Sequence, residues 1–231
     1  MEQRSKKTLS RISGCGTACA KLALSLALFV PALATLSLRI QEPADALSTH
    51  SARASETHEI LRPKELVQIY SIVRSHRPDV AEPEIWRLSQ VIYEETSKRG
   101  VDPLIVLALI RVESGFRPKA VSPAGARGIM QIMPDTGRTL AGAMAGDYGF
   151  RPAAFTAESL DDPVLNLRLG IYYLYDLKKQ FQNWSVALTA YNFGPIDTQN
   201  RIDNNLDLSE EFAGLVLQAY QRYKNAKHPT F

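Results

Sequence analysis

The chain has 231 residues, of which 45% are hydrophobic and 22% charged, a balance typical of one modest globular domain and not of a disordered protein. The net charge of +3 arises near the N-terminus, because residues 1–46 carry six basic and three acidic side chains and the rest carry 21 of each. A neutral body argues against a nucleic-acid-binding protein that depends on contacts between basic side chains and phosphates.

The N-terminal region has the layout of an export segment. Basic and polar residues 1–21 precede an uncharged apolar run, LALSLALFVPALATLSL, at residues 22–38. This order is typical of a secretory signal peptide or of a short membrane anchor, and Pro31 within the run favours the cleaved signal peptide. We therefore predict that residues 1–46 are a signal peptide or membrane anchor and that the rest of the chain is exported.

Cysteine and histidine usage limits the chemistry of the exported part. Both cysteines, Cys15 and Cys19, fall in the export segment, so the rest contains no disulfide and no thiol nucleophile. The four histidines are scattered, and none has a partner at the spacing of metal ligands. We expect neither a metal site nor a cofactor. The histidines are His50, His58, His76 and His228.

A helical domain follows a short linker. Residues 47–62 are rich in Ala, Ser, Glu and Thr without an apolar period, which is typical of a linker. Over residues 63–228 apolar residues recur at spacings of three and four, the period of an α-helix. The pattern predicts an all-α domain, or an α domain with a minor β element. Predicted helices begin near Pro63, Pro83, Pro103, Pro163, Trp184 and Glu210.

One carboxylate lies on the apolar face of the third of these helices. Asp102 and Pro103 are a strong helix start, and Gly115 is a typical helix end. Glu113 shares its face with Ile110, one turn earlier. Burial on that face and the negative end of the helix dipole both raise the pKa of a carboxyl group, which suits a general acid working near neutral pH.

Position alone leaves a second interpretation of Glu113 equally well supported. In that interpretation Glu113 is a structural residue that forms an ion pair with Arg111 or Arg127. The next stretch, FRPKAVSPAGARGIMQIMP at residues 116–134, favours the functional interpretation. It is dense in Pro and Gly and predicts a loop that can approach a ligand closely, turning helical at about Ile129.

Side chains of this loop suit a carbohydrate. Gln131 can donate and accept hydrogen bonds, as sugar hydroxyls and acetamido groups require. Met130 and Met133 offer adaptable apolar surface, and we expect one of the two to lie in the core. Residues 137–159, rich in Gly and Ala, then predict a loop with short helical turns that forms part of a cleft wall.

Three short motifs resemble the signature of the soluble lytic transglycosylase family. They are ESG at residues 113–115, GIMQIMP at 128–134 and AYNFGP at 190–195, in the family's order and spacing. The resemblance covers residues 85–225 and extends to a fourth pattern, Asn-x3-Gly-x2-Tyr-Leu, at 166–174. It implies a lysozyme-like SLT domain that cleaves bacterial peptidoglycan. Family members usually have a small residue where this chain has Phe193.

The resemblance also implies a mechanism with one carboxylate. Glu113 would protonate the glycosidic oxygen between MurNAc and GlcNAc, and its carboxylate would then take the proton of the MurNAc 6-hydroxyl as that oxygen attacks C1. The product is a 1,6-anhydro-MurNAc end. Ordinary glycosidases use two carboxylates, and the motif loops supply no dependable second one. By motif match, substrate would be positioned by Ser122, Gln131, Met133, Tyr191 and Asn192.

Two alternatives stay open beside the lytic transglycosylase. One is a hydrolytic muramidase or chitinase on the same fold, and the other is a non-catalytic peptidoglycan-binding assembly protein. The resemblance implies a monomer in the periplasm, either released or anchored to the inner membrane, that binds peptidoglycan glycan strands. General wall turnover and a dedicated role beside an envelope-spanning secretion or appendage machine are both consistent with the sequence.

Overall fold

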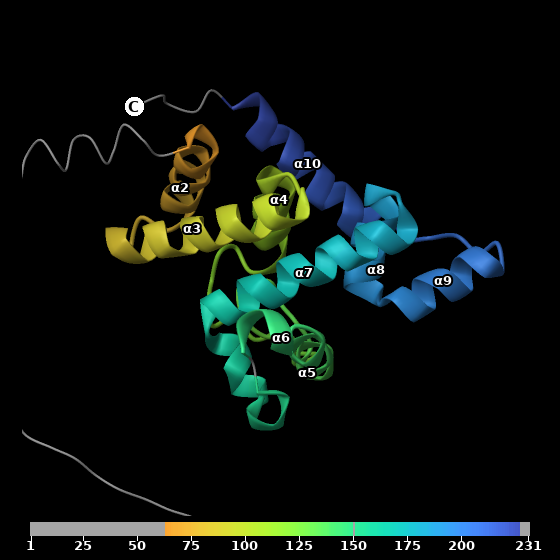
Figure 1. Cartoon of the computed structure of the whole chain (residues 1–231). Helices are drawn as coiled ribbons and strands as arrows, with labels where there is room; N and C mark the ends of the chain where they lie inside the picture. Colours follow the sequence, from red (N-terminus) through yellow and green to blue (C-terminus); the bar gives the residue numbers. More distant parts are fainter. Residues whose placement is uncertain (1–62, 150, 227–231) are drawn as a thin grey trace, which may run out of the picture. The chain divides into compact units, whose positions relative to one another are not determined.

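The computed structural model describes residues 63–149 and 151–226, and within these ranges it is helical (Figure 1). The predicted export segment, the linker and residues 227–228 of the predicted domain lie outside the described residues. The helices are α2 (Lys64–His76), α3 (Glu82–Arg99), α4 (Pro103–Glu113), α5 (Pro134–Ala143), α6 (Ala145–Tyr148), α7 (Pro163–Phe181), α8 (Trp184–Phe193), α9 (Pro195–Asp203) and α10 (Glu211–Asn225), with 3-10 turns η1 (Pro152–Ala154) and η2 (Ala157–Asp161).

The predicted all-α class is confirmed. Extended pairing in the described part of the chain is limited to two isolated bridges, Val121 with Arg127 and Arg127 with Ile132. Both lie in the loop between α4 and α5, so the minor β element is a feature of that loop. None of the helices in the described ranges is both long and apolar enough to span a membrane.

Helix starts follow the capping signals of the sequence. Asp102 accepts a 2.9 Å hydrogen bond from the Leu104 amide at the start of α4, and Asp162 accepts a 2.8 Å bond from the Val164 amide at the start of α7. In both helices proline occupies the first position, where a missing N–H leaves no bond unmade. These caps fix the phase of α4 and therefore the direction in which Glu113 projects.

Helix α4 lies at the centre of the core. Every residue from Leu104 to Ile110 is buried, and the helix packs against α10, α2 and α3 (Figure 1). The sequence predicted one apolar face on this helix. The structure shows that its residues from Leu104 to Ile110 are apolar on every face, as in a helix that is enclosed on all sides. Glu113 therefore follows a buried stretch of helix by one turn, which holds it rigidly.

Two segments differ from the sequence-based expectation. Helix α5 begins at Pro134 and not at Ile129, because the backbone of residues 127–132 pairs with itself before the helix starts. Residues 195–203 form α9, which follows α8 directly: Gly194 takes φ 95° and Pro195 occupies the first helical position. The break between α8 and α9 is therefore a sharp turn between two helices.

Candidate active site

The end of α4 turns sharply after Glu113. Ser114 is the C-cap, and Gly115 and Phe116 both adopt left-handed backbone, with φ of 59° and 63°. The Phe116 ring is buried and stacks on His76 at 4.5 Å between ring centres, and Arg77 Nη1 donates a 2.8 Å hydrogen bond to the Phe116 carbonyl. These contacts with α2 hold a conformation that a residue other than glycine disfavours, and they fix the turn beside Glu113.

Burial sets the electrostatics of Glu113. Desolvation raises the pKa of its carboxyl group from 4.5 to about 8, so the group is protonated at neutral pH. The raised pKa expected from the sequence is confirmed. Burial is the cause of this shift.

The interpretation of Glu113 as half of a structural ion pair is wrong. Arg127 forms a two-bond pair with Asp161, at 3.1 Å from Nε and 2.7 Å from Nη2. Arg111 acts on His76 instead. Burial lowers the pKa of the His76 imidazole most, and the Arg111 guanidinium lowers it further. No ion pair within residues 63–149 and 151–226 includes Glu113.

The loop between α4 and α5 is a folded unit. Arg127 and Ile132 exchange two backbone hydrogen bonds of 3.0 Å, and the Gly128 amide donates to the Ala120 carbonyl at 2.9 Å. Gly128 has φ 82°, and a Cβ at this position would lie 2.1 Å from Asn166 Nδ2. Glycine is therefore required here by both conformation and space.

Three distant parts of the sequence converge on the backbone of Ile129 and Met130. Ser114 Oγ, at the end of α4, donates a 2.6 Å hydrogen bond to the Ile129 carbonyl. Asn166 Oδ1, on α7, accepts a 2.8 Å bond from the Met130 amide. The Tyr191 hydroxyl, on α8, donates a 2.9 Å bond to the Met130 carbonyl. Side chains from three of the sequence motifs thus form hydrogen bonds with the backbone of two residues of the remaining motif, GIMQIMP.

The amide of Gln131 is used inside the loop. Gln131 adopts left-handed backbone with φ 50°, and its Nε2 donates to the carbonyls of Ala120 at 3.0 Å and Gly128 at 2.9 Å. Both amide protons are therefore engaged by main chain. The side-chain carbonyl oxygen is the group of Gln131 that suits a sugar hydroxyl as an acceptor.

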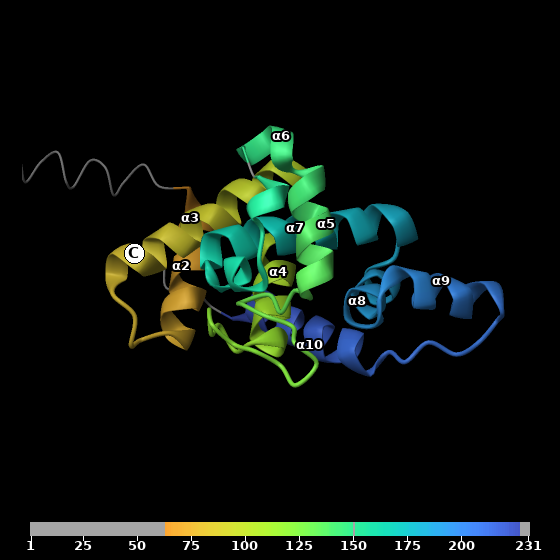
Figure 2. The same cartoon turned by 90° about the horizontal axis from the view of Figure 1, so that it is seen from below.

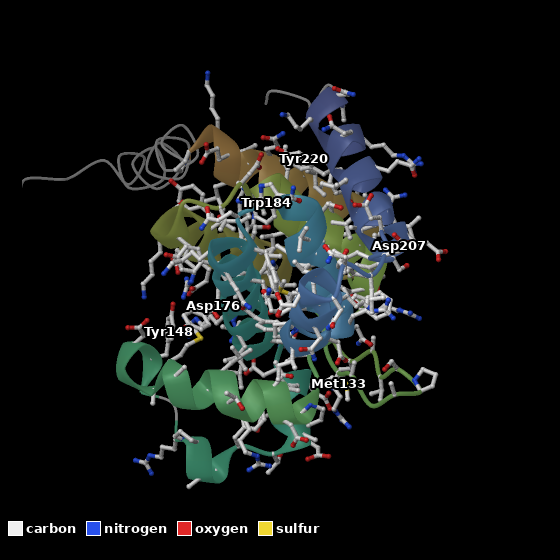
Figure 3. All side chains as sticks on the ribbon, turned by 90° about the vertical axis from the view of Figure 1, so that its right-hand side faces the viewer. Met133, Tyr148, Asp176, Trp184, Asp207 and Tyr220 are labelled. Atoms are coloured by element: carbon white, nitrogen blue, oxygen red, sulfur yellow. The ribbon has the colours of Figure 1, made fainter. Side chains whose placement is uncertain are left out.

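The other predicted substrate-binding residues differ in exposure. Ser122 is half-buried, and its Oγ accepts a 3.0 Å bond from the Ala126 amide within a turn. Met133, labelled in Figure 3, lies where the loop meets α5. Its side chain is 43% exposed, whereas Met130 is fully buried. The expectation that one of the two methionines belongs to the core is confirmed. Asn192 is exposed in the last turn of α8.

Tyr191 lies in the electrostatic field of Glu113. Its pKa is raised well above the usual value, first by burial, then by the Glu113 carboxylate and by Tyr173. The Tyr173 ring is tilted against the Tyr191 ring at 5.2 Å between centres. Tyr173 thus packs beside this cluster from α7.

Sequence reasoning underrated two polar residues. Asn166 is fully buried, and its Nδ2 also donates to the carbonyls of Arg127 and Leu160 at 3.0 Å each. Ser114 is 1% exposed. The available signal for Asn166 was an amide side chain on the apolar face of a helix, where burial requires hydrogen-bond partners.

Asp, Glu, His and Cys side chains other than Glu113 could serve as metal ligands, and Asp or Glu as a second acid. Across the described ranges no group of three or more His, Cys, Asp or Glu side chains is arranged to hold a metal ion. Asp161 is paired with Arg127, which lowers the pKa of Asp161. The arrangement offers one protonated carboxyl group beside a rigid, polar loop.

Comparison with known proteins gives a consistent pattern. The model of the family described as "Transglycosylase SLT domain" matches residues 90–211, more than half of the chain. A membrane-bound lytic murein transglycosylase C from Haemophilus influenzae is 31% identical over 135 residues, which are 58% of this chain and 34% of the relative. A soluble lytic murein transglycosylase from Escherichia coli is 35% identical over 101 residues, 43% of this chain and 15% of the relative.

Solved structures agree with the family match. The 70-kDa soluble lytic transglycosylase from Escherichia coli superposes with a TM-score of 0.50 and 27% identity, covering 67% of this chain and 28% of that one. The same kind of enzyme in complex with bulgecin A gives a TM-score of 0.52 and 27% identity, covering 69% and 29%. The match thus covers about a third of the Haemophilus influenzae relative and less of the Escherichia coli proteins.

Proposed function

Because the chain belongs to the Transglycosylase SLT domain family, we propose that it is a peptidoglycan lytic transglycosylase. Its reaction would cleave the β-1,4 bond between MurNAc and GlcNAc and leave a 1,6-anhydro-MurNAc end. The observation that carries the proposal is Glu113, a half-buried carboxyl group whose pKa of about 8 keeps it protonated at neutral pH. A general acid of this kind is what cleavage of a glycosidic bond requires first.

The reaction needs one carboxyl group in two roles. Glu113 gives its proton to the glycosidic oxygen as the bond from that oxygen to C1 breaks, and the N-acetyl group of MurNAc helps to stabilise the positive charge at C1. The Glu113 carboxylate then removes the proton of the MurNAc 6-hydroxyl while O6 bonds to C1. Glu113 ends protonated, and no water is consumed.

Positioning would contribute much of the rate, because the attacking hydroxyl is part of the substrate. The loop that follows α4 supports this role, since Ser114, Asn166 and Tyr191 hold its backbone at Ile129 and Met130. The substrate-positioning residues in the proposal are Ser122, Gln131, Met133, Tyr191 and Asn192. Gln131 would accept a hydrogen bond from a sugar hydroxyl, and exposed Met133 would offer apolar contact.

The remaining parts of the proposal concern the whole chain. Residues 1–46 would act as a signal peptide or membrane anchor, residues 47–62 as a linker, and residues 63–228 as the catalytic domain. The protein would work as a monomer in the periplasm, released or anchored, on glycan strands. The relatives from Haemophilus influenzae are named membrane-bound, which supports an envelope location for this chain too.

Product analysis tests the proposal. Purified peptidoglycan is digested with the full chain and with Glu113→Gln, and the products are weighed by mass spectrometry. We expect anhydro ends, lighter by one water than reducing ends, from the wild type and none from the variant. Reducing ends alone would indicate a hydrolase, and intact glycan with both proteins would indicate a binding protein.

A further inference from the structure

A cavity of about 250 Å³ lies between α8, α9 and the segment that leads to α10. Most of its surface is apolar. The lining residues come from three short stretches that follow one another along the chain. Its size suits one large side chain or a small group. The lining residues are Thr189, Phe193, Thr198, Arg201, Asp207, Leu208 and Ser209.

This cavity is separate from the candidate active site. Thr189 and Phe193 are four residues apart on α8 and share one face of the helix. Tyr191, two residues from each, projects to the opposite face, where its hydroxyl reaches Met130. Helix α8 therefore separates the cavity from the loop beside Glu113.

The walls of the cavity are held in place by hydrogen bonds. The Leu206 amide donates to the Arg201 carbonyl at 2.8 Å, and Arg201 Nη1 donates to the Asp207 carbonyl at 3.0 Å. Thr198 Oγ1 donates to the Gly194 carbonyl at 2.9 Å, within α9. The site is pre-formed, so a ligand would not have to order it on binding.

Helix α9 projects from the domain and exposes apolar side chains. It packs mainly on α8, and Figures 1 and 2 both show it extending beyond the other helices. Four of the seven large apolar side chains that are exposed in the described part of the chain lie on α9 or within three residues of its ends. They are Phe193 (50% exposed), Ile196 (75%), Ile202 (39%) and Leu206 (56%). Apolar exposure gathered in one place marks an interaction surface.

The charge around the cavity is mainly negative, although Arg201 lines the cavity beside Asp207. Residues 194–211 carry five acidic side chains, all exposed, and a single basic one, Arg201. Asp207 lines the cavity itself and lies at the edge of the molecule in Figure 3. Peptidoglycan carries carboxylates of its own, so this surface does not complement it. A partner with lysine or arginine beside an apolar side chain does.

We propose that the cavity between α8 and α9 is a docking site for a protein segment that inserts one large apolar side chain and presents lysine or arginine to the acidic rim. The apolar anchor would fill the space beside Phe193 and Leu208, and the basic group would face Asp207. Such a site would recruit the domain to a protein in its surroundings without covering Glu113. The proposal is independent of the reaction that Glu113 performs.

Peptide binding to the full chain tests this site. The probe is a fluorescein-labelled helical peptide with tryptophan and leucine on one face and lysine on the other, followed by fluorescence anisotropy. Two control peptides replace every lysine by glutamate or the tryptophan by alanine. We expect only the first peptide to bind with measurable affinity, and we expect its affinity to fall as the ionic strength rises.

Matched variants locate the binding. Asp207→Asn and Leu208→Ser should each weaken the peptide by about fivefold or more, as expected for a central anchor or its charge partner. Asp203→Asn and Ile196→Ser lie on the same projection outside the cavity lining and should change affinity by less than about twofold. Peptidoglycan cleavage should be unchanged in all four, which separates this test from that of the proposed reaction.

Three results would overturn the proposal. Equal binding of the glutamate peptide would remove the charge argument. Displacement of the peptide by a soluble GlcNAc oligosaccharide would make the cavity a glycan site. Dimerisation of the chain that Leu208→Ser abolishes, measured by sedimentation, would assign the surface to a second copy of this chain.

Discussion

The hydroxyl of Tyr191 donates a 2.9 Å hydrogen bond to the backbone carbonyl of Met130, across 61 residues of sequence. A tyrosine hydroxyl has a single proton, so in this arrangement Tyr191 can accept from a substrate but cannot donate to it. Tyr191 also lies close enough to Glu113 for the carboxylate to raise the pKa of the phenol, after burial. The residue therefore joins the rigid loop to the surroundings of the proposed acid.

Replacing Tyr191 by Phe should lower both stability and activity. The change leaves the Met130 carbonyl without this partner in a buried place, which costs about 1–3 kcal/mol. Urea unfolding measures the loss of stability, and the rate of peptidoglycan cleavage measures the effect of a loosened loop. Tyr173→Phe is the matched control on the neighbouring ring and should change both quantities much less. Equal effects in the two variants would contradict a special role for the bond to Met130.

Stability should depend on pH through Glu113. Its pKa is about 8 in the folded protein and near 4.5 when unfolded, so between these values the folded state binds one proton more than the unfolded state. Stability that depends on Glu113 is therefore greatest below pH 4.5, falls as the pH rises toward 8, and is constant above. Over this pH range the free energy of unfolding of the wild type should fall by on the order of a few kcal/mol relative to that of Glu113→Gln. Parallel curves for the two proteins would contradict the raised pKa.

The rate of cleavage should depend on the same ionisation of Glu113. Glu113 must be protonated to act as the acid, so cleavage should decline as the pH rises through about 8. The measurement is the initial rate of release of anhydro products at a series of pH values. Asp161→Asn serves as a control, since it should weaken the bond to Arg127 without moving the midpoint of this decline. A decline centred near pH 4.5, the unperturbed value, would exclude Glu113 as the acid.

Features of the site that depend on neighbouring residues could be predicted from the sequence, whereas contacts between residues far apart in the sequence could not. Asp102, Pro103 and Gly115 act locally, so the sequence fixes the ends of α4 and the place of Glu113 on it. Arg127 was an equally good candidate partner for Glu113 in sequence terms. Its pairing with Asp161, 34 residues away, is set by the packing of α7 against the loop, which no local pattern reports.

The same limit applies to the loop and to α9. The left-handed backbone of Gln131 depends on two carbonyls that its own side chain binds, and a pattern of residue types does not reveal such a bond. Helix α9 was not expected, because polar residues 195–203 have no apolar stripe wide enough for a core-facing helix. It exists as a projection on α8, where little of its surface needs to be buried.

Asn166 should prove essential to the loop. It is fully buried and makes three hydrogen bonds, to the Met130 amide and to the carbonyls of Arg127 and Leu160. Asn166→Ala leaves these backbone groups unpaired, so we expect a loss of about 3 kcal/mol or more in the free energy of unfolding. Asn166→Asp keeps the acceptor for the Met130 amide but removes the two donors. Activity measured where both variants remain folded should fall in each, and an unchanged rate would show that the loop needs no such tie.

The two glycines of the loop provide a matched pair for the last prediction. Gly128 and Gly125 have similar φ, 82° and 89°, so a side chain at either costs about 1–2 kcal/mol in backbone strain. Their surroundings differ: a Cβ at Gly128 would lie 2.1 Å from Asn166 Nδ2 and 2.4 Å from the Leu160 carbonyl, whereas nothing lies within 4 Å of one at Gly125. Gly128→Ala should therefore destabilise the protein well beyond Gly125→Ala and abolish cleavage, since it expels Asn166 from its site. Thermal unfolding and cleavage rates of the two variants measure this difference, and similar losses in both would mean that backbone strain alone selects glycine at residue 128.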